Sequence, residues 1–217
     1  SLKNAYGILA DSALHHFDEI IAVGPAVEHV LRSAPTTWFR RQAPVTMIAN
    51  GVDERAFAFD MGARRTTRSS LGLGTNEQVL VSVSRLHPQK GLAESLNAFA
   101  RARQISPFLN YVIVGSGPSE TALRRQAARL NVLSNVRFTG ALGRRELAAI
   151  LSAADVFVFT SKRREGLALG PLAAAAAGPP CIVSSHVQVP GANFTSVAPR
   201  DTTAVRDAIL LELGRLA

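Results

Sequence analysis

The sequence has one cysteine, Cys181, among its 217 residues. A single thiol excludes an internal disulfide framework and a zinc site built from several cysteines. We expect Cys181 to pack as a small apolar residue in a strand. The most apolar stretch, residues 167–183, is broken by glycines and prolines, so we expect no transmembrane helix. No signal peptide is visible, which predicts a cytoplasmic protein.

Aromatic residues are also scarce, at 6% of the chain, whereas positive charge is abundant. The net charge is +8 and the sequence pI is about 10.9, which favours an anionic ligand. Nucleic acid is one such anion, but only the charge supports it as the ligand. The sequence lacks the aromatic platform of single-strand binders, and its cations are scattered rather than gathered in one arm. The clusters are Arg40–Arg41, Arg64–Arg65, Arg124–Arg125, Arg144–Arg145 and Lys162–Arg164.

Hydrophobic residues make up 47% of the chain, and their spacing alternates between two patterns. Short apolar runs rich in β-branched residues indicate strands buried on both faces, and runs with helical spacing lie between them. The expected strands are residues 19–23, 45–48, 79–83, 111–114, 136–138, 156–159, 181–183 and, weakly, 195–198. The expected helices include residues 2–17, 24–33, 62–71 and 167–177, and a last one capped by Asp201 or Thr202. This alternation predicts an α/β fold with a doubly wound parallel sheet.

The loop after the strand at 79–83 contains two cations, Arg85 and Lys90, in the sequence SRLHPQKG. Arginine offers a planar fork to phosphate oxygens and lysine adds a mobile point charge, so the pair suits a diphosphate. A solvated loop with two ordinary cations explains the pattern equally well.

A glycine turn, Gly115-Ser116-Gly117, follows the strand at 111–114 directly. Glycines there allow a ligand to approach the backbone closely, but the third glycine of a dinucleotide fingerprint is absent. A plain turn between a strand and a helix accounts for it as well.

A charged loop lies between the strand at 156–159 and an alanine-rich helix. Ligands of open α/β sheets bind at the carboxyl ends of strands, and the start of a helix favours an anion. Glu165 fits there as an acceptor for sugar hydroxyls, although a lone glutamate in a loop is usually just solvated. The segment Asn50–Asp53 is read as an ordinary turn or an interdomain hinge.

In order and spacing these segments resemble the donor-binding half of retaining GT-B glycosyltransferases of family 4. The resemblance covers nearly the whole chain. The matching segments are Ala49–Asp53 with the hinge, Val83–Leu86 and Lys90–Gly91 with the diphosphate motif, Val112–Gly117 with the second strand and glycine turn, Phe138–Gly140 and Glu146–Leu147 with the base-contacting segment, and Ser161 and Glu165–Gly178 with the Glu-x7-Glu region.

The resemblance implies transfer of a sugar from a UDP-, GDP- or ADP-sugar with retention of configuration, without a cofactor or metal. It implies that Arg85 and Lys90 neutralise the donor diphosphate and that Glu165 is the catalytic residue that accepts hydrogen bonds from the transferred sugar. The other donor-binding positions that it implies are Gly117, Leu142 beside the base, Gly166, Leu167, Ala168, Leu169 and Ala173.

The resemblance also implies the organisation of the chain. Residues 1–53 would be the remnant of an N-terminal acceptor domain with the hinge, and residues 54–217 the nucleotide-sugar-binding domain. The implied partners are a nucleotide-sugar donor, a sugar or lipid-linked acceptor, residues of the missing N-terminal domain and, for a lipid-linked acceptor, a membrane surface bound peripherally. Nucleic acid is not an implied partner.

Departures from the family pattern leave an alternative open. Ala173 takes the place of the second glutamate, Leu167 and Ala168 replace a Phe-Gly pair, and residues 187–191 lack the glycines and the acid of a downstream motif. These changes favour a degenerate, non-catalytic binding or partner module. A sugar-nucleotide epimerase of similar architecture fits the Arg85, Lys90 and Glu165 motifs less well.

Overall fold

A computed structural model describes residues 17–33, 43–165, 167–187 and 194–216. The chain divides into two compact units. The first comprises Ser1–Gly51 with Glu165–Leu167, and the second comprises Val52–Arg164 and Ala168–Ala217. The helix expected at residues 2–17 lies, apart from Phe17, outside the described residues.

The described part of the first unit is a strand-helix-strand arrangement. It consists of β1 (Ile20–Ala22), α2 (Pro25–Ser33) and β2 (Val45–Met47), with β1 and β2 paired in parallel. Proline suits the first position of α2 because its ring fixes a helical φ and the N–H it lacks would have no helical partner. Both strands and the helix were predicted to within two residues at each end.

The second unit contains a six-stranded sheet with the order β5-β4-β3-β6-β7-β8, in which every pairing between described strands is parallel. This confirms the predicted doubly wound α/β fold. The strands are β3 (Gln78–Val83), β4 (Leu109–Val114), β5 (Val136–Gly140), β6 (Val156–Phe159), β7 (Cys181–Ser184) and β8 (Phe194–Val197). The helices are α3 (Glu54–Phe57), α4 (Met61–Ser70), α5 (Leu92–Arg103), α6 (Glu120–Arg129), α7 (Arg144–Ala153), α8 (Leu169–Ala177) and α9 (Thr202–Gly214), with short 3-10 turns η1 (Pro88–Lys90) and η2 (Leu133–Asn135).

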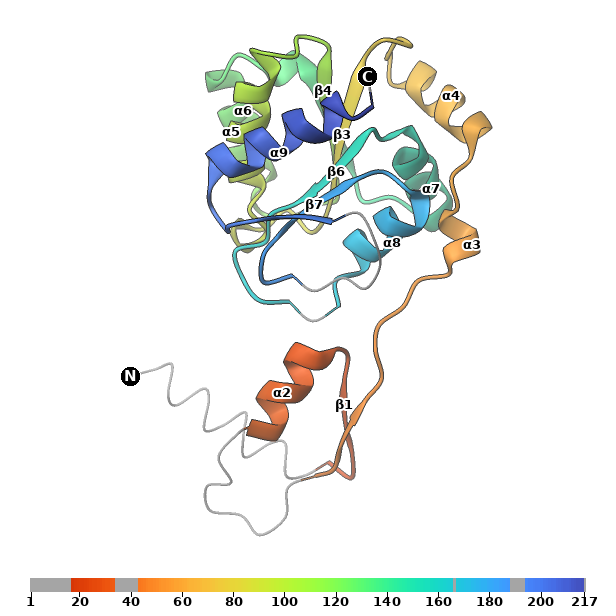
Figure 1. Ribbon diagram of the computed structural model, residues 1–217, viewed down its shortest axis with the longest axis vertical. Coiled ribbons are helices and arrows are strands. Elements are labelled where there is room, and N and C mark those ends of the chain that lie inside the picture. Colours follow the sequence, from red (N-terminus) through yellow and green to blue (C-terminus); the bar gives the residue numbers. More distant parts are fainter. Residues whose placement is uncertain (1–16, 34–42, 166, 188–193, 217) are drawn as a thin grey trace. The chain divides into compact units, whose positions relative to one another are not determined.

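Helices cover both faces of this sheet (Figure 1). One face packs against α5, α6 and α9, and the other against α3, α7 and α8. Every residue of β4 and of β6 is buried, because strands between two helix layers have no solvent face. That is why these strands appear in the sequence as unbroken apolar runs.

Two helices differ most from the sequence-based expectation. Helix α8 begins at Leu169 rather than at residue 167, because Pro171 is tolerated only within the first turn of a helix. The short helix α3 was not predicted. The Asp53 side chain caps it by accepting from the Arg55 N–H at 3.1 Å, and Phe57 anchors it in the core.

The chain order places a topological switch between β3 and β6. From β3 the chain moves outward to β4 and β5, then returns to the other side of β3 to form β6, β7 and β8. The loops after β3 and β6 therefore leave the carboxyl edge of the sheet in opposite directions. In open parallel sheets this divergence creates a crevice for a ligand.

Candidate functional site

The loops that follow β3 and β6 are joined by hydrogen bonds. The Lys162 N–H donates to the Gln89 carbonyl at 2.8 Å, and the Ser161 hydroxyl donates to the same carbonyl at 3.3 Å. The Thr160 hydroxyl donates to the Gly91 carbonyl at 3.0 Å. The loop of Lys90 is therefore held against the end of β6.

The glycine turn after β4 supports the same loop from the other side. The Leu86 N–H donates to the Ser116 carbonyl at 2.9 Å, and the Ser119 N–H donates to the Leu86 carbonyl at 3.0 Å. A Cβ at Gly115 would lie 1.9 Å from the Ser84 carbonyl oxygen, and one at Gly117 would lie 2.4 Å from that of Leu86. These glycines thus allow the backbone of the Arg85 loop to pack closely, while contact of Gly117 with a donor stays a prediction.

Arg85 and Lys90 lie in this braced loop but differ in exposure. Arg85 is exposed, and its guanidinium forms no hydrogen bond or ion pair with any residue that the structure describes. Lys90 is half-buried, and its Nζ lies 5.5 Å from the ring centroid of Phe159, within the range of a cation–π contact. Residue 91 follows with a left-handed φ of 70°, which glycine adopts without a steric penalty.

The three cations after β6, Lys162–Arg164, differ in their contacts and exposure. Lys162 Nζ forms an ion pair with Glu94 Oε1 of α5 at 2.7 Å, and both side chains are largely buried. Arg163 and Arg164 are exposed, and the Arg163 carbonyl accepts from His186 Nε2 at 2.9 Å. The first cation of this cluster is therefore held by α5.

The start of α8 reaches the end of β3. A Cβ at Gly170 would lie 2.7 Å from the Val83 carbonyl oxygen, so the first turn of α8 lies directly beside the residue where the Arg85 loop begins. Ala168 is the N-cap and has no polar side chain to accept from the first-turn N–H groups. Such groups at the start of a helix suit an anion.

The remaining predicted site residues have mixed positions. Ala173 is 2% exposed and packs in the apolar core, and Leu142 packs against that core from the loop before α7. Glu165 and Leu167 belong to the first unit, where Asn50 Nδ2 donates to the Leu167 carbonyl at 2.9 Å. Gly166 lies outside the described residues. Convergence of Glu165 with Arg85 and Lys90 therefore stays a prediction.

Beneath the Lys90 loop lies a group of buried hydroxyls that the sequence analysis did not single out. The Tyr111 and Ser82 hydroxyl oxygens are 2.7 Å apart, and the Ser95 and Thr160 hydroxyl oxygens are 2.6 Å apart. Burial raises the pKa of Tyr111 to about 12. Isolated serines and threonines carry no motif, and only the neighbouring apolar strand residues hinted that these side chains would be buried.

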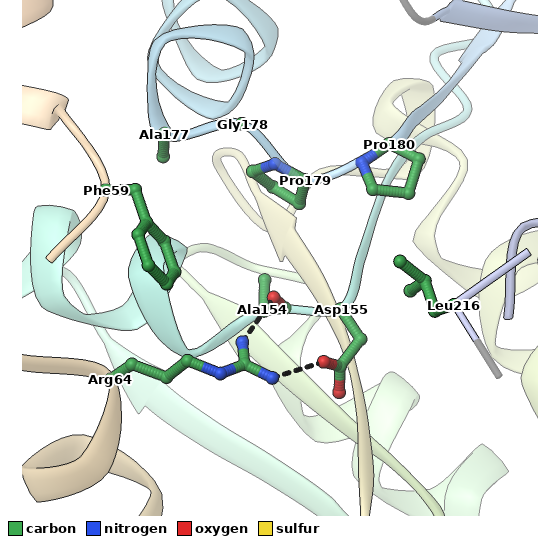
Figure 2. A pocket seen from close by; sticks show the side chains of 9 residues that line it. All are labelled: Phe59, Arg64, Ala154, Asp155, Ala177, Gly178, Pro179, Pro180 and Leu216. Carbon is green, nitrogen blue, oxygen red and sulfur yellow. Dashed lines mark hydrogen bonds and ion pairs between the residues drawn. The ribbon is translucent and has the colours of Figure 1, made fainter. Parts of the chain in front are cut away.

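A hollow lies at the amino edge of the sheet, and Figure 2 shows its lining. Its volume is about 290 Å³, slightly below the usual range for small-molecule sites. Its charged groups already bind each other, because Arg64 Nη2 pairs with Asp155 Oδ1 at 2.5 Å and Arg64 Nη1 donates to the Ala154 carbonyl. The carboxyl edge is therefore the better candidate for a ligand site.

Across the described ranges, no group of three or more His, Cys, Asp or Glu side chains is placed to hold a metal ion. None of the helices in those ranges is long and apolar enough to cross a membrane.

A parallel six-stranded sheet with its crevice at the β3/β6 switch is the Rossmann-like architecture of GT-B glycosyltransferases. The chain belongs to the family "Glycosyl transferases group 1", whose family model matches residues 63–193, more than half of the chain.

Curated relatives carry transferase and synthase names. Over 212 residues the chain is 32% identical to a GDP-mannose-dependent alpha-(1-6)-phosphatidylinositol monomannoside mannosyltransferase of Mycolicibacterium smegmatis, a match that covers 93% of this chain and 55% of the relative. Over 172 residues it is 34% identical to the glycogen synthase of Mycobacterium tuberculosis, covering 77% of this chain and 39% of the relative. The chain thus spans about half, or less, of the length of these relatives.

The crystal structure of Anabaena Alr3699/HepE in complex with UDP-glucose has the same fold. It superposes with a TM-score of 0.83 at 20% identity, covering 96% of this chain and 58% of that chain. At this identity the likeness establishes the architecture alone.

Proposed function

We propose that this chain carries the donor site of a glycosyltransferase that moves a sugar from a nucleoside-diphosphate sugar to an acceptor, with retention of configuration. The observation that carries the proposal is the bracing of the Arg85–Lys90 loop. Contacts from Ser116 and from Thr160 hold this loop at the β3/β6 switch, and the start of α8 lies beside Val83, where β3 ends.

The chemistry follows from the charge that develops as the sugar leaves. Breaking the bond to the sugar leaves additional negative charge on the nucleoside diphosphate. Arg85, Lys90 and the first-turn N–H groups of α8 would neutralise that charge in a fixed arrangement. Preorganised positive groups of this kind stabilise a transition state without having to reorganise.

The remaining roles are proposed from the family resemblance. Glu165 would accept hydrogen bonds from the transferred sugar, the backbone at residues 166–169 would hold sugar or phosphate oxygens, and Leu142 and Gly117 would lie beside the base and the phosphates. The HepE complex with UDP-glucose and the GDP-mannose-dependent relative support a nucleotide-sugar donor. They leave uracil and guanine both open as the base.

Residues 1–53 would contain the hinge and part of an acceptor domain. The named relatives suggest two kinds of acceptor, a glycolipid for the mannosyltransferase and a glucan for the glycogen synthase. A glycolipid acceptor would bring the protein to a membrane surface as a peripheral protein.

Ala173 favours a second candidate function. Where the resemblance places a carboxylate for the ribose, this chain has an alanine that is 2% exposed in the core. A lost hydrogen bond to a charged group costs about 1.5–3 kcal/mol, which is roughly a ten- to hundredfold loss of affinity. A chain that has lost donor binding in this way would serve as a non-catalytic partner module.

Calorimetric titration with UDP, GDP, ADP and their sugars distinguishes the two candidates. We expect one nucleotide to bind, and Arg85→Ala to weaken its binding by about ten- to hundredfold through loss of charged hydrogen bonds. Arg65→Ala is the matched control, because Arg65 is an exposed cation on α4 and the net charge changes equally. A folded wild-type chain that binds none of these nucleotides would favour the partner module.

A further inference from the structure

Thr160, the first residue after β6, is buried in a polar contact with α5. It is 2% exposed, and its hydroxyl lies 2.6 Å from the Ser95 hydroxyl and donates to the Gly91 carbonyl at 3.0 Å. That carbonyl also accepts from the Ser95 N–H at 3.0 Å. Ser95 is fully buried, so the Gly91 oxygen is held by two donors in a place that water does not reach.

The backbone of Gly91 also lies directly against the backbone of Thr160. A Cβ at Gly91 would be 1.9 Å from the Thr160 carbonyl oxygen. One residue earlier, Lys90 Nζ lies over the ring of Phe159, at 5.5 Å from its centroid. Phe159 and Thr160, at the end of β6, therefore contact Lys90 and Gly91, at the end of the Arg85–Lys90 loop.

The contacts between the end of β6 and the Lys90 loop continue in the residues that follow β6. The Ser161 hydroxyl and the Lys162 N–H both donate to the Gln89 carbonyl, and Lys162 Nζ pairs with Glu94 of α5. The Lys90 loop is thus aligned with the end of β6 over several residues. The Thr160 and Ser95 hydroxyls form the most buried link in this series.

A valine at position 160 would fill nearly the same space as threonine, so packing alone does not require the hydroxyl. Hydrogen bonds add direction, which apolar contacts lack. We propose that Thr160 and Ser95 are positioning residues of the donor site, which fix the Gly91 carbonyl and thereby the place of Lys90 relative to the donor diphosphate. This proposal rests on the proposed function.

The first test needs no nucleotide. Thr160→Val keeps the shape and removes the hydroxyl, whereas Thr160→Ser keeps the hydroxyl. We expect amide hydrogen exchange in residues 88–95 to be about two- to tenfold faster in Thr160→Val, as for one lost buried hydrogen bond, and near wild type in Thr160→Ser. Thr195→Val removes the hydroxyl that donates to Glu212, at the amino end of β8, and should leave this segment unchanged. Unchanged exchange in Thr160→Val would overturn the proposal, whatever the chain binds.

The second test separates positioning from general stability. In the proposed site Lys90 contacts the diphosphate and not the nucleoside. Thr160→Val should therefore weaken binding of the nucleoside diphosphate about three- to tenfold and leave binding of the nucleoside alone unchanged. In a Lys90→Met background, Thr160→Val should then add no further loss. An equal loss for nucleoside and diphosphate, or full additivity with Lys90→Met, would overturn the positioning role.

The two proposals fail in different ways. Suppose that the wild-type chain binds no nucleotide, although amide hydrogen exchange is faster in Thr160→Val than in wild type. The proposed function is then wrong, and the donor role of Thr160 is wrong with it. If nucleotide binds and Thr160→Val changes neither exchange nor affinity, only the positioning role is wrong.

Discussion

The two edges of the six-stranded sheet use arginine in opposite ways. At the amino edge, Arg68 is 7% exposed and donates to Asp155 Oδ2, to the Ala153 carbonyl and to the Glu77 carbonyl. At the carboxyl edge, Arg85 is exposed, and its guanidinium pairs with none of the described residues. Removing a buried cation that has several acceptors destabilises the fold, whereas an exposed cation in a rigid loop remains available to a ligand.

Asp155 is central to the amino edge. Its carboxylate binds Arg64 and Arg68 of α4, and Oδ2 also accepts from the Val79 N–H at 2.8 Å. Because Asp155 precedes β6 and Val79 lies in β3, these contacts join the two strands of the switch at their amino ends. The difference between the edges teaches that charge density alone does not locate the site, since both edges are rich in arginine.

Arg68→Met should cause the largest loss of stability. It leaves the largely buried Asp155 carboxylate with one fewer cation and removes a donor from three carbonyls, and breaking such a network typically costs about 3–5 kcal/mol. Urea unfolding of the variant measures the loss. Arg65→Met, an exposed position on the same helix, should change stability by no more than about 0.5 kcal/mol. Equal stability of the two variants would show that the amino edge does not depend on its buried cation.

Gly91→Ala should have the next largest effect, at the carboxyl edge. The new Cβ would lie 1.9 Å from the Thr160 carbonyl at a φ of +70°, so overpacking adds to backbone strain, for a loss of about 2–4 kcal/mol. Gly72→Ala is a matched control, because its φ is +69° but nothing lies within 4 Å of the added Cβ. Its cost should be backbone strain alone, about 1–2 kcal/mol. Similar unfolding free energies for both variants would mean that the loop can move away from β6.

The sequence predicted the strands well because burial on both faces leaves a local signal. The strand at 156–159 was predicted to the residue, and Cys181 lies buried in β7 as expected. The cations carry no such signal. Lys162, Arg163 and Arg164 look alike in sequence, and only the position of α5 shows that Lys162 pairs with Glu94. Contacts between residues far apart in sequence decide which cation is structural. The sequence therefore predicts candidate site residues but not the contacts that support them.

Between the two edges lies the buried Tyr111, and its deprotonation should lower the free energy of unfolding at high pH. Burial raises the pKa of Tyr111 to about 12 from an ordinary value of 10.0. The unfolded chain then loses this proton first, so stability that is fully present below pH 10 is lost as the pH rises toward 12. The slope is about 1.4 kcal/mol per pH unit and the total about 2–3 kcal/mol. Urea unfolding between pH 9 and 11.5 measures this slope.

Tyr111→Phe is the control for this pH dependence, since phenylalanine keeps the ring and cannot ionise. Burial also raises the pKa of Cys181 to about 12 from 9.0, so comparison in a Cys181→Ala background isolates the tyrosine. If Tyr111→Phe keeps the full slope above pH 10, the tyrosine is accessible to water and the hydroxyl cluster beneath the Lys90 loop is not dry.

The smallest expected change in stability is the one that tests the comparison most directly. Arg85→Met should change the free energy of unfolding by no more than about 0.5 kcal/mol, because the side chain is exposed and unpaired among the described residues. The same change should weaken binding of the nucleoside diphosphate by about ten- to hundredfold. Arg68→Met should do the reverse at temperatures where it is folded, with a large loss of stability and nearly unchanged affinity. Two identical substitutions would then separate the edge that holds the sheet together from the edge that binds the donor. A loss of affinity in Arg68→Met as large as that in Arg85→Met would instead show that the two edges are coupled through β3.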